Sequence, residues 1–222
     1  INKVIPGMDG IICSDYHKGI LTEKVVKADM SRAKKFKKAV IVDPKSSDFS
    51  LYKGAAVLTP NLREISRSVP IKIEYKEDLC RAAEYLLNLT KAEAILITQG
   101  KDGMSLYQNK EQLISIPTVA KAVFDVTGAG DKVISVFSMA VFVGFDYQEA
   151  AWLSNMAASV VVGKVGTAVV TLEEINEFLK EEMLRTSNTI LKLDELKKII
   201  SMAKSSDKKV VFTNGCFDII HG

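Results

Sequence analysis

One glycine-rich turn in the middle of the chain pairs a candidate phosphate site with a carboxylate. Residues 125–131 read DVTGAGD and stand directly before a long apolar stretch that we expect to be a buried helix. Backbone N–H groups at a helix start attract anions, and Gly128 and Gly130 leave no side chain in the way of a phosphate. Asp131 would stand beside this site, where it could accept the proton of an attacking hydroxyl during phosphoryl transfer. Without further context, such a pattern more often marks only a turn and a helix cap.

Two more polar patterns follow short apolar runs upstream. Asn61 and Glu64 come after the run at 55–58, and at a helix start their spacing places both side chains on one face. An amide and a carboxylate there suit a hydrated Mg²⁺ that bridges nucleotide phosphates, or else they form a turn with a capping Asn and a solvated Glu. Lys45 follows the run at 39–42 and is either a phosphate contact or a surface lysine.

A third pattern is the turn that contains Thr98, Gly100 and Gly103, which closes the apolar run at 94–98. Its glycines fit a strand-end loop that lies along a nucleotide. They fit the turn that begins a β-hairpin equally well, so the spacing alone leaves both interpretations open.

Around these motifs, short apolar runs alternate with amphipathic stretches, which predicts a mostly parallel sheet covered by helices. We expect strands at 10–14, 39–42, 55–58 and 94–98, and a hairpin formed by 104–107 and 112–116. We expect helices at 23–38, 77–89, 132–143, 148–162, 172–184 and 194–204. Parallel strands place their C-terminal ends together, where ligands bind in open α/β sheets, so Lys45 and the Asn61 motif should lie at that edge.

Composition and charge exclude several classes of protein. The net charge of the 222 residues is +3 with Lys and Arg scattered, so charge gives no case for nucleic acid binding. Three widely spaced cysteines imply no disulfide framework and fit a reducing cytoplasm. Two histidines add no metal-ligand spacing, no apolar run reaches the ~18 residues of a membrane span, and no secretory leader is visible. We expect a cytoplasmic protein that acts on small molecules.

The DVTGAGD motif with its apolar helix resembles the second family motif of the ribokinase-like carbohydrate kinases. The resemblance implies an α/β ribokinase-like fold, ATP as phosphoryl donor, and Asp131 as the catalytic base. Gly128, Ala129 and Gly130 would form the anion hole. Lys132 stands where many members have Thr, which adds a cation beside the phosphates.

The same resemblance assigns the other polar motifs to the nucleotide. Asn61 and Glu64 match the family's N-x-x-E element, which organises Mg²⁺ and phosphates, with Glu64 reaching the metal through water. Asn155 falls where family members line the adenine pocket. The further residues implied to contact ATP are Lys45, Thr98, Gly100, Gly103 and Lys164.

Several segments resemble the branch of this family that phosphorylates heptose phosphates, among them SDYHKG at 14–19, DPK at 43–45 and GMSL at 103–106. The resemblance covers nearly the whole chain and implies ATP-dependent phosphorylation of D-glycero-D-manno-heptose 7-phosphate at C1. Two alternatives stay open. One is a kinase of the same family for another sugar or sugar phosphate, and the other is a non-catalytic nucleotide-binding module, against which Asp131 argues.

The end of the chain resembles a second family. TNGCFDIIHG at 213–222 is similar to the opening of a nucleotidyltransferase domain, whose nucleotide site would begin with Asn214, Gly215, Phe217 and His221. We therefore expect three parts. Residues 1–184 would be the C-terminal, ATP-binding portion of a kinase that lacks its N-terminal part, and 185–208 a linker and helix. Residues 209–222 would be the truncated start of the second domain, with its first strand beginning at 209.

These resemblances imply a longer, bifunctional whole protein. It would make ADP-heptose for the lipopolysaccharide core, and we expect it to be a homodimer without nucleic acid or membrane partners. Since the kinase portion would lack its N-terminal part, we expect the chain by itself to be inactive.

Overall fold

The structure is a computed structural model of the chain, and it describes residues 4–108, 113–119, 129–162, 169–186, 193–205 and 209–211. The chain forms two compact units, residues 1–175 and 176–222. The first unit contains the sheet and the candidate site.

The first unit is built on a sheet in which four parallel strands are followed by an antiparallel hairpin. Within the described residues, the strands are β1 (Gly10–Ser14), β2 (Ala39–Asp43), β3 (Val57–Leu58), β4 (Ala94–Thr98), β5 (Met104–Gln108) and β6 (Ile114–Ile116). They lie side by side in chain order; β1 to β4 are parallel, and β5 is antiparallel to both β4 and β6. The mostly parallel sheet and the hairpin are thereby confirmed.

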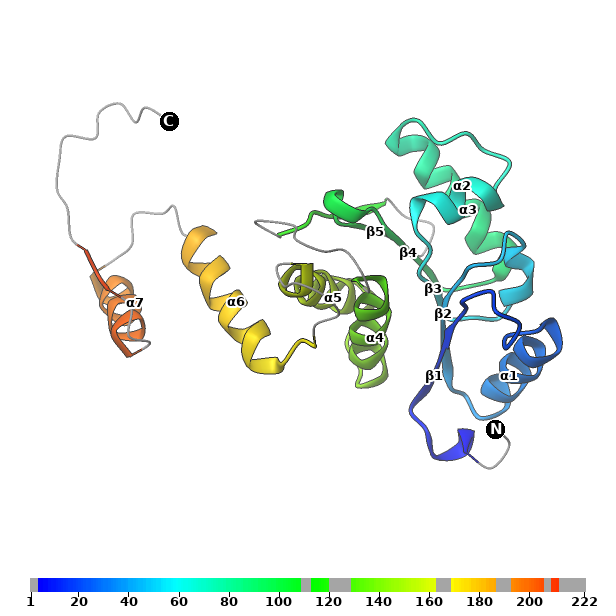
Figure 1. Ribbon diagram of the computed structural model, residues 1–222, viewed down its shortest axis with the longest axis horizontal. Coiled ribbons are helices and arrows are strands. Elements are labelled where there is room, and N and C mark those ends of the chain that lie inside the picture. Colours follow the sequence, from blue (N-terminus) through cyan, green and yellow to red (C-terminus); the bar gives the residue numbers. More distant parts are fainter. Residues whose placement is uncertain are drawn as a thin grey trace. The chain divides into compact units, whose positions relative to one another are not determined.

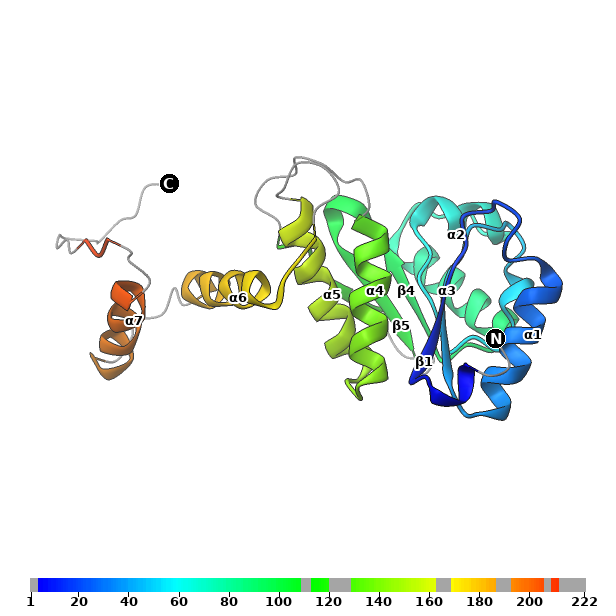
Figure 2. The ribbon, with the colours of Figure 1, turned by 60° about the horizontal axis from the view of Figure 1, so that its bottom comes forward.

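Helices cover both faces of this sheet. The helices of the described residues are α1 (Glu23–Lys35), α2 (Leu62–Ser68), α3 (Lys76–Thr90), α4 (Ala129–Phe142), α5 (Tyr147–Val162), α6 (Leu172–Thr186) and α7 (Leu193–Ser205). Helices α1, α2 and α3 lie on one face, and α4 and α5 lie on the other (Figures 1 and 2). None of these helices is long and apolar enough to cross a membrane.

Each face of the sheet carries its own apolar core, because neighbouring residues of a strand point to opposite faces. In β2, Val40 and Val42 belong to the core under α1 and α3, whereas Ile41 belongs to the core under α4 and α5. Strand β4 repeats this pattern, with Ile95 in the first core and Leu96 in the second. Burial on both faces explains why the strands read as continuous apolar runs.

Two elements are shorter than their apolar patterns predict: one helix ends earlier and one strand begins later. The helix expected over 23–38 ends at Lys35, because the left-handed φ of 53° at Lys37 cannot continue a helix. The strand expected over 55–58 contains only Val57–Leu58. An apolar pattern records burial, which here continues beyond the hydrogen-bonded element.

Most of the predicted second domain lies outside the described residues. Residues 209–211 carry no strand, although we expected one to begin there, and residues 212–222 lie outside the described part of the chain. The division into three parts therefore stays a prediction.

One turn after β4 depends on a glycine for steric reasons. Gly103 has φ 88° and ψ −127°, a combination that residues with a Cβ rarely adopt. A Cβ at this position would lie 2.2 Å from the carbonyl oxygen of Ile116 and 2.5 Å from the backbone nitrogen of Thr118. The backbone after β6 is thus in direct contact with this turn. Backbone atoms cannot move aside for a Cβ as the end of a flexible side chain could.

We predict that Gly103→Ala lowers the free energy of unfolding by about 2–4 kcal/mol, because the new methyl group adds a backbone clash to an unfavourable φ. Gly100→Ala is the matched control: its φ is 61°, and a Cβ there meets no atom within 4 Å. It should cost only about 1–2 kcal/mol. Denaturant unfolding of both variants checks this, and equal losses would contradict the clash.

Candidate active site

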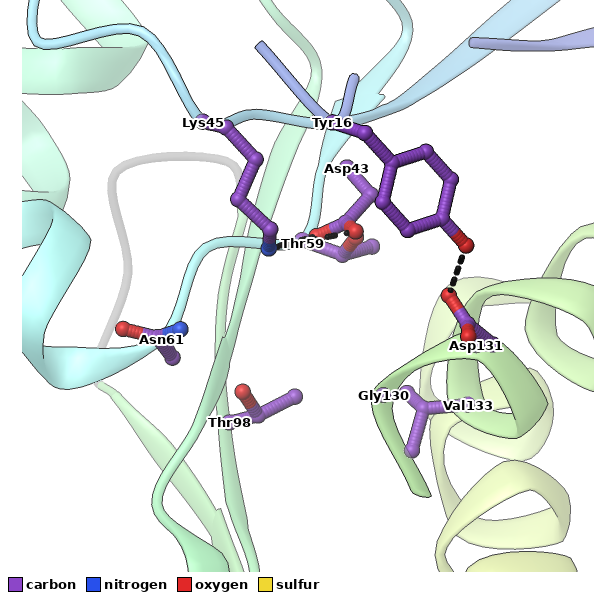
Figure 3. A pocket seen from close by; sticks show the side chains of 9 residues that line it. All are labelled: Tyr16, Asp43, Lys45, Thr59, Asn61, Thr98, Gly130, Asp131 and Val133. Carbon is purple, nitrogen blue, oxygen red and sulfur yellow. Dashed lines mark hydrogen bonds and ion pairs between the residues drawn. The ribbon is translucent and has the colours of Figure 1, made fainter. Parts of the chain in front are cut away.

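A polar cavity of about 210 Å³ opens where the parallel strands end, beside the first turn of α4 (Figure 3). Its walls come from the last residues of β2 and β4, from the segments after β1, β2 and β3, and from the start of α4. The lining residues are Tyr16, Asp43, Lys45, Thr59, Asn61, Thr98, Gly130, Asp131 and Val133. The structure therefore brings five predicted site residues to one cavity: Lys45, Asn61, Thr98, Gly130 and Asp131.

Asn61 and Glu64 form a capping box at the start of α2. The Asn61 Oδ1 accepts a hydrogen bond from the Glu64 N–H at 3.0 Å, and the Glu64 Oε2 accepts one from the Asn61 N–H at 2.8 Å. These bonds satisfy backbone donors that the helix itself leaves unpaired. The capping interpretation is thus confirmed for Asn61. Glu64 is not solvated, however, since its side chain is only 12% exposed.

The second oxygen of Glu64 belongs to an ionic cluster centred on Lys45. The Lys45 Nζ lies 2.7 Å from Glu64 Oε1 and 3.3 Å from both carboxylate oxygens of Asp43. Figure 3 shows the Lys45 side chain reaching down to the Asp43 carboxylate. Lys45 therefore points into the cavity with its charge shared between two carboxylates, which a surface lysine would not do.

Burial and charge shift the pKa values of this cluster. Burial raises the pKa of Asp43 to about 6; Lys45 opposes the shift, and the neighbouring charge of Glu64 adds to it. Burial would lower the pKa of Lys45, but its bonds to Glu64 and Asp43 outweigh that effect and the pKa is raised. Lys45 thus remains a cation, while Asp43 is the carboxylate whose charge the site accommodates least well.

Asp131 lies in the first turn of α4 and is half-buried. Its Oδ1 accepts a hydrogen bond from the Tyr16 hydroxyl at 2.8 Å, and its backbone carbonyl accepts one from the Ser135 hydroxyl at 2.6 Å. Because α4 begins at Ala129, the N–H groups of this first turn lack intrahelical partners and make the same region favourable for an anion. A carboxylate and an anion-attracting helix start therefore share one side of the cavity.

The donors at this cavity fit a hydrated cation rather than a metal cage. The described residues contain no group of three or more His, Cys, Asp or Glu side chains arranged to hold a metal. Asp43 and Glu64 nevertheless both pair with the ammonium group of Lys45, so this space already accommodates positive charge. Mg²⁺ typically uses one or two carboxylates together with waters and substrate phosphates, and these residues satisfy that need.

Four predicted site residues are not part of the cavity lining: Glu64, which contacts the lining residue Lys45, and Gly100, Gly103 and Asn155. Gly100 and Gly103 belong to the 3₁₀ turn Gly100–Asp102 and its cap, where Gly103 leaves room for the chain after β6. Asn155 is buried in α5, and its Nδ2 donates a hydrogen bond to the Pro117 carbonyl at 2.7 Å. This bond ties α5 to the chain after β6, and a role in an adenine pocket stays a prediction.

Other predicted residues cannot be placed. Gly128, Lys164 and the four second-domain residues Asn214, Gly215, Phe217 and His221 lie outside the described residues, and of Ala129 only the helical backbone is described. The complete anion hole therefore also stays a prediction.

Sequence reasoning assigned no role to four residues of the cavity, which are Tyr16, Asp43, Thr59 and Val133. Asp43 and Thr59 stand at the ends of β2 and β3, and the rule that parallel strands end together could have identified them. Tyr16 gave no such signal. It contacts Asp131 across 115 residues of sequence, and no local pattern records a contact of that kind.

A family model described as pfkB family carbohydrate kinase matches residues 8–175 of the chain. Two curated relatives, both named Bifunctional protein HldE, are similar over almost the whole chain. The one from Desulfatibacillum aliphaticivorans is 43% identical over 217 residues, 98% of this chain and 44% of the relative. The one from Geobacter sulfurreducens is 45% identical over 211 residues, 95% of this chain and 43% of the relative. The chain spans less than half the length of these relatives.

Solved structures resemble the chain in fold. Arabidopsis thaliana ribokinase, complexed with ribose and ATP, has a TM-score of 0.72 at 22% identity and covers 81% of this chain, which corresponds to 58% of that protein. Phosphofructokinase-2 from Escherichia coli, in complex with potassium, has a TM-score of 0.70 at 18% identity over 80% of this chain and 59% of that protein. At such low identities the likeness shows the fold alone, and it confirms the predicted ribokinase-like α/β fold.

The raised pKa of Asp43 predicts how stability depends on pH. The ordinary pKa is 3.8 and the folded value is about 6, so between these pH values the folded state binds more protons than the unfolded state. Stability should therefore fall as the pH rises through this window, by about 1–3 kcal/mol. Asp43→Asn removes the effect, so the variant should gain that much relative to the parent between pH 4 and pH 7.

Denaturant unfolding of parent and variant across this pH range is the measurement. Asp9→Asn, which changes an exposed carboxylate before β1, is the matched control for the loss of one negative charge. A difference between Asp43→Asn and parent that stays constant with pH would contradict the assignment.

Proposed function

The chain belongs to the pfkB family of carbohydrate kinases, and on this premise we propose that it carries the ATP-binding and catalytic part of a sugar-phosphate kinase. The reaction we propose is transfer of the γ-phosphoryl group of ATP to the C1 hydroxyl of D-glycero-D-manno-heptose 7-phosphate. The observation that carries the proposal is the meeting of Asp131, at the start of α4, with the polar ends of the parallel strands in one cavity.

Asp131 is the general base in this proposal. The acceptor hydroxyl donates its proton to the Asp131 carboxylate as its oxygen attacks the γ-phosphorus, and ADP leaves. The unpaired N–H groups of the first turn of α4 stabilise the negative charge on the transferred group. Phosphoryl transfer depends mostly on positioning and electrostatic stabilisation, so a base and an anion site on one helix turn supply its main needs.

Lys45 and its carboxylate partners form the phosphate side of the site. The ammonium group of Lys45 is available to nucleotide phosphates once they compete with Glu64 and Asp43 for it. Mg²⁺ supplies charge neutralisation of the phosphates when bound, and Glu64 and Asn61 would hold it through water. In the absence of the metal, Lys45 keeps the two carboxylates from repelling each other.

The assignment of heptose phosphate as the acceptor rests on sequence segments rather than on geometry. The segments at 14–19 and 43–45 resemble the heptose-phosphate branch of the family, and both provide side chains to the cavity. Curated relatives are named Bifunctional protein HldE, and the chain spans less than half of their length. Both facts support a second activity in the whole protein.

We extend the proposal to the whole protein on that basis. It would adenylylate heptose 1-phosphate to ADP-heptose for the lipopolysaccharide core, in the cytoplasm and as a homodimer. Asn214, Gly215, Phe217 and His221 would begin its second nucleotide site. The chain taken alone would then be an inactive part of this enzyme.

A kinase of the same family for another sugar is the nearest alternative. A panel of sugars and sugar phosphates, offered with ATP to the full-length protein, separates the two. Preference for a different acceptor would replace the heptose and keep the kinase. ATP binding without transfer to any acceptor would favour a nucleotide-binding module.

We predict that Asp131→Asn in the full-length protein lowers kcat by about 10²–10⁴-fold, the usual contribution of a positioned general base. Asn keeps the size and the capping ability of Asp, so the fold and the affinity for ATP should change little. Asp146→Asn is the matched control, since Asp146 caps α5 by accepting a bond from the Glu149 N–H at 2.8 Å and does not line the cavity. Steady-state kinetics measures kcat, and thermal melting checks the fold. A folded Asp131→Asn enzyme with the kcat of the parent would refute the assignment of Asp131 as the general base.

We predict that Glu64→Gln raises the Mg²⁺ concentration needed for half-maximal activity by about tenfold, as the loss of an outer-sphere partner does. Gln can still complete a capping box, so the start of α2 should persist. Glu149→Gln makes the same change in the capping box of α5 and serves as control. Identical Mg²⁺ titrations for Glu64→Gln and the parent would leave Glu64 with a capping role alone.

A further inference from the structure

We propose that Tyr16 is a positioning residue for Asp131: its hydroxyl holds one oxygen of the carboxylate so that the other faces the acceptor hydroxyl. The proposal rests on the proposed function in so far as it takes Asp131 as the base. It assigns a role to a residue that lies in the SDYHKG segment at 14–19 but received no function of its own from the sequence.

The contact joins two distant parts of the fold. Tyr16 follows β1, Asp131 begins α4, and the Tyr16 hydroxyl donates to Asp131 Oδ1 at 2.8 Å. Figure 3 shows the ring of Tyr16 descending from the strand-end side of the cavity, with its hydroxyl directed at the carboxylate. Tyr16 is 55% exposed, so apolar burial does not account for its position. The hydrogen bond to Asp131 orients its hydroxyl, and the Lys18 Nζ, 5.9 Å from the ring centre, contacts the ring.

The segment that carries Tyr16 is anchored by a buried carboxylate on its N-terminal side. Asp15 is 4% exposed; its Oδ1 accepts the backbone N–H of His17 at 2.7 Å, and its Oδ2 accepts the hydroxyl of Tyr52 at 2.5 Å. The Asp15 N–H also donates to the Asp43 carbonyl at 3.0 Å, which continues the pairing of β1 with β2. Asp15 is thus fixed through both its backbone and its side chain.

This anchor forces the chain to turn at His17, which has a left-handed φ of 53°. Such a φ is unfavourable for a residue with a Cβ and persists where surrounding bonds impose it. Here the bond from the His17 N–H to Asp15 closes the turn. Tyr16, between the anchor and the turn, has its backbone direction set, and its side chain projects toward α4.

The direction of the hydrogen bond suits a positioning role. The bond to Asp131 is the first cause of a raised pKa for the Tyr16 hydroxyl, so Tyr16 remains protonated and remains the donor. A carboxylate has two oxygens and accepts several hydrogen bonds. A donor fixed on Oδ1 therefore limits rotation of the carboxylate and leaves the other oxygen free to accept the proton of a substrate.

The kinetic test uses the full-length protein, ATP and the sugar phosphate, with Tyr16→Phe, Asp131→Asn and the double variant. Tyr16→Phe keeps the ring and removes the donor. We expect kcat to fall about tenfold, as for a misoriented catalytic group, while the KM for ATP stays within about twofold. In the Asp131→Asn background, Tyr16→Phe should change the residual rate less than about twofold, since the base it positions is gone. Tyr85→Phe, an exposed tyrosine of α3, is the control.

Two kinetic results would overturn the proposal. Additive losses in the double variant would mean that Tyr16 acts independently of Asp131. A lower KM for the sugar phosphate with unchanged or higher kcat in Tyr16→Phe would mean that the Tyr16 hydroxyl occupies the acceptor's place and is displaced by it.

A second measurement needs no acceptor and so separates this proposal from the proposed function. In crystals of the full-length protein without sugar, the Asp131 carboxylate should have one orientation in the parent and more than one in Tyr16→Phe. A single, unchanged orientation in the variant would refute positioning even if the kinase reaction is confirmed. A parent that transfers phosphate to no sugar would refute the proposed function, and the crystallographic comparison would still decide the role of Tyr16.

Discussion

The parallel hydrogen bonding of β1 to β4 is the constraint on which the candidate active site depends. At the C-terminal end of this ladder, the Asp15 N–H bonds to the Asp43 carbonyl at 3.0 Å, and the Thr98 N–H bonds to the Pro60 carbonyl at 2.9 Å. These bonds keep the strand ends level, so each chain segment leaves the sheet beside its neighbours. Side chains separated by tens of residues in sequence then line one small cavity. Helix α4 forms the remaining wall, because its apolar residues pack against one face of the sheet. A change of strand order or direction would disperse the site even if every side chain were retained.

Charge balance is the second property of this edge. Asp43, Glu64 and Asp131 approach one another there, and Lys45 bridges the first two. Burial and like charge make the ionised form of Asp43 costly, whereas both carboxylates hold Lys45 firmly in its charged form. This arrangement keeps the ammonium group of Lys45 close to the anion-attracting start of α4. Under the proposed function, nucleotide phosphates compete with the carboxylates for Lys45, and a metal ion offsets the negative charge that they bring.

Structural and functional interpretations of a motif turn out to be compatible. Asn61 and Glu64 form a complete capping box, yet Asn61 lines the cavity and Glu64 binds Lys45 with the oxygen that the box leaves available. Gly103 provides the opposite case, since its close approach to the Ile116 carbonyl accounts for the glycine without any ligand. Asn155 likewise has a structural partner in the Pro117 carbonyl. A side chain with several acceptors can serve the fold and a ligand together, whereas a steric requirement for glycine is satisfied by the fold alone.

By itself, the sequence determined the class of fold and the position of the site along the sheet. Alternating apolar runs and amphipathic stretches predicted the parallel sheet and its helices, because burial on both faces leaves a direct record in residue type. The strand-end motifs placed Lys45 and Asn61 near one edge for the same topological reason, and the family resemblance joined Asp131 to them. Only the tertiary structure decided which side chains touch: that Lys45 bridges Asp43 and Glu64, and that Tyr16 reaches Asp131. Those contacts depend on side-chain direction and on the packing of α4 against the sheet, and neither leaves a periodic or local signal in the order of the residues.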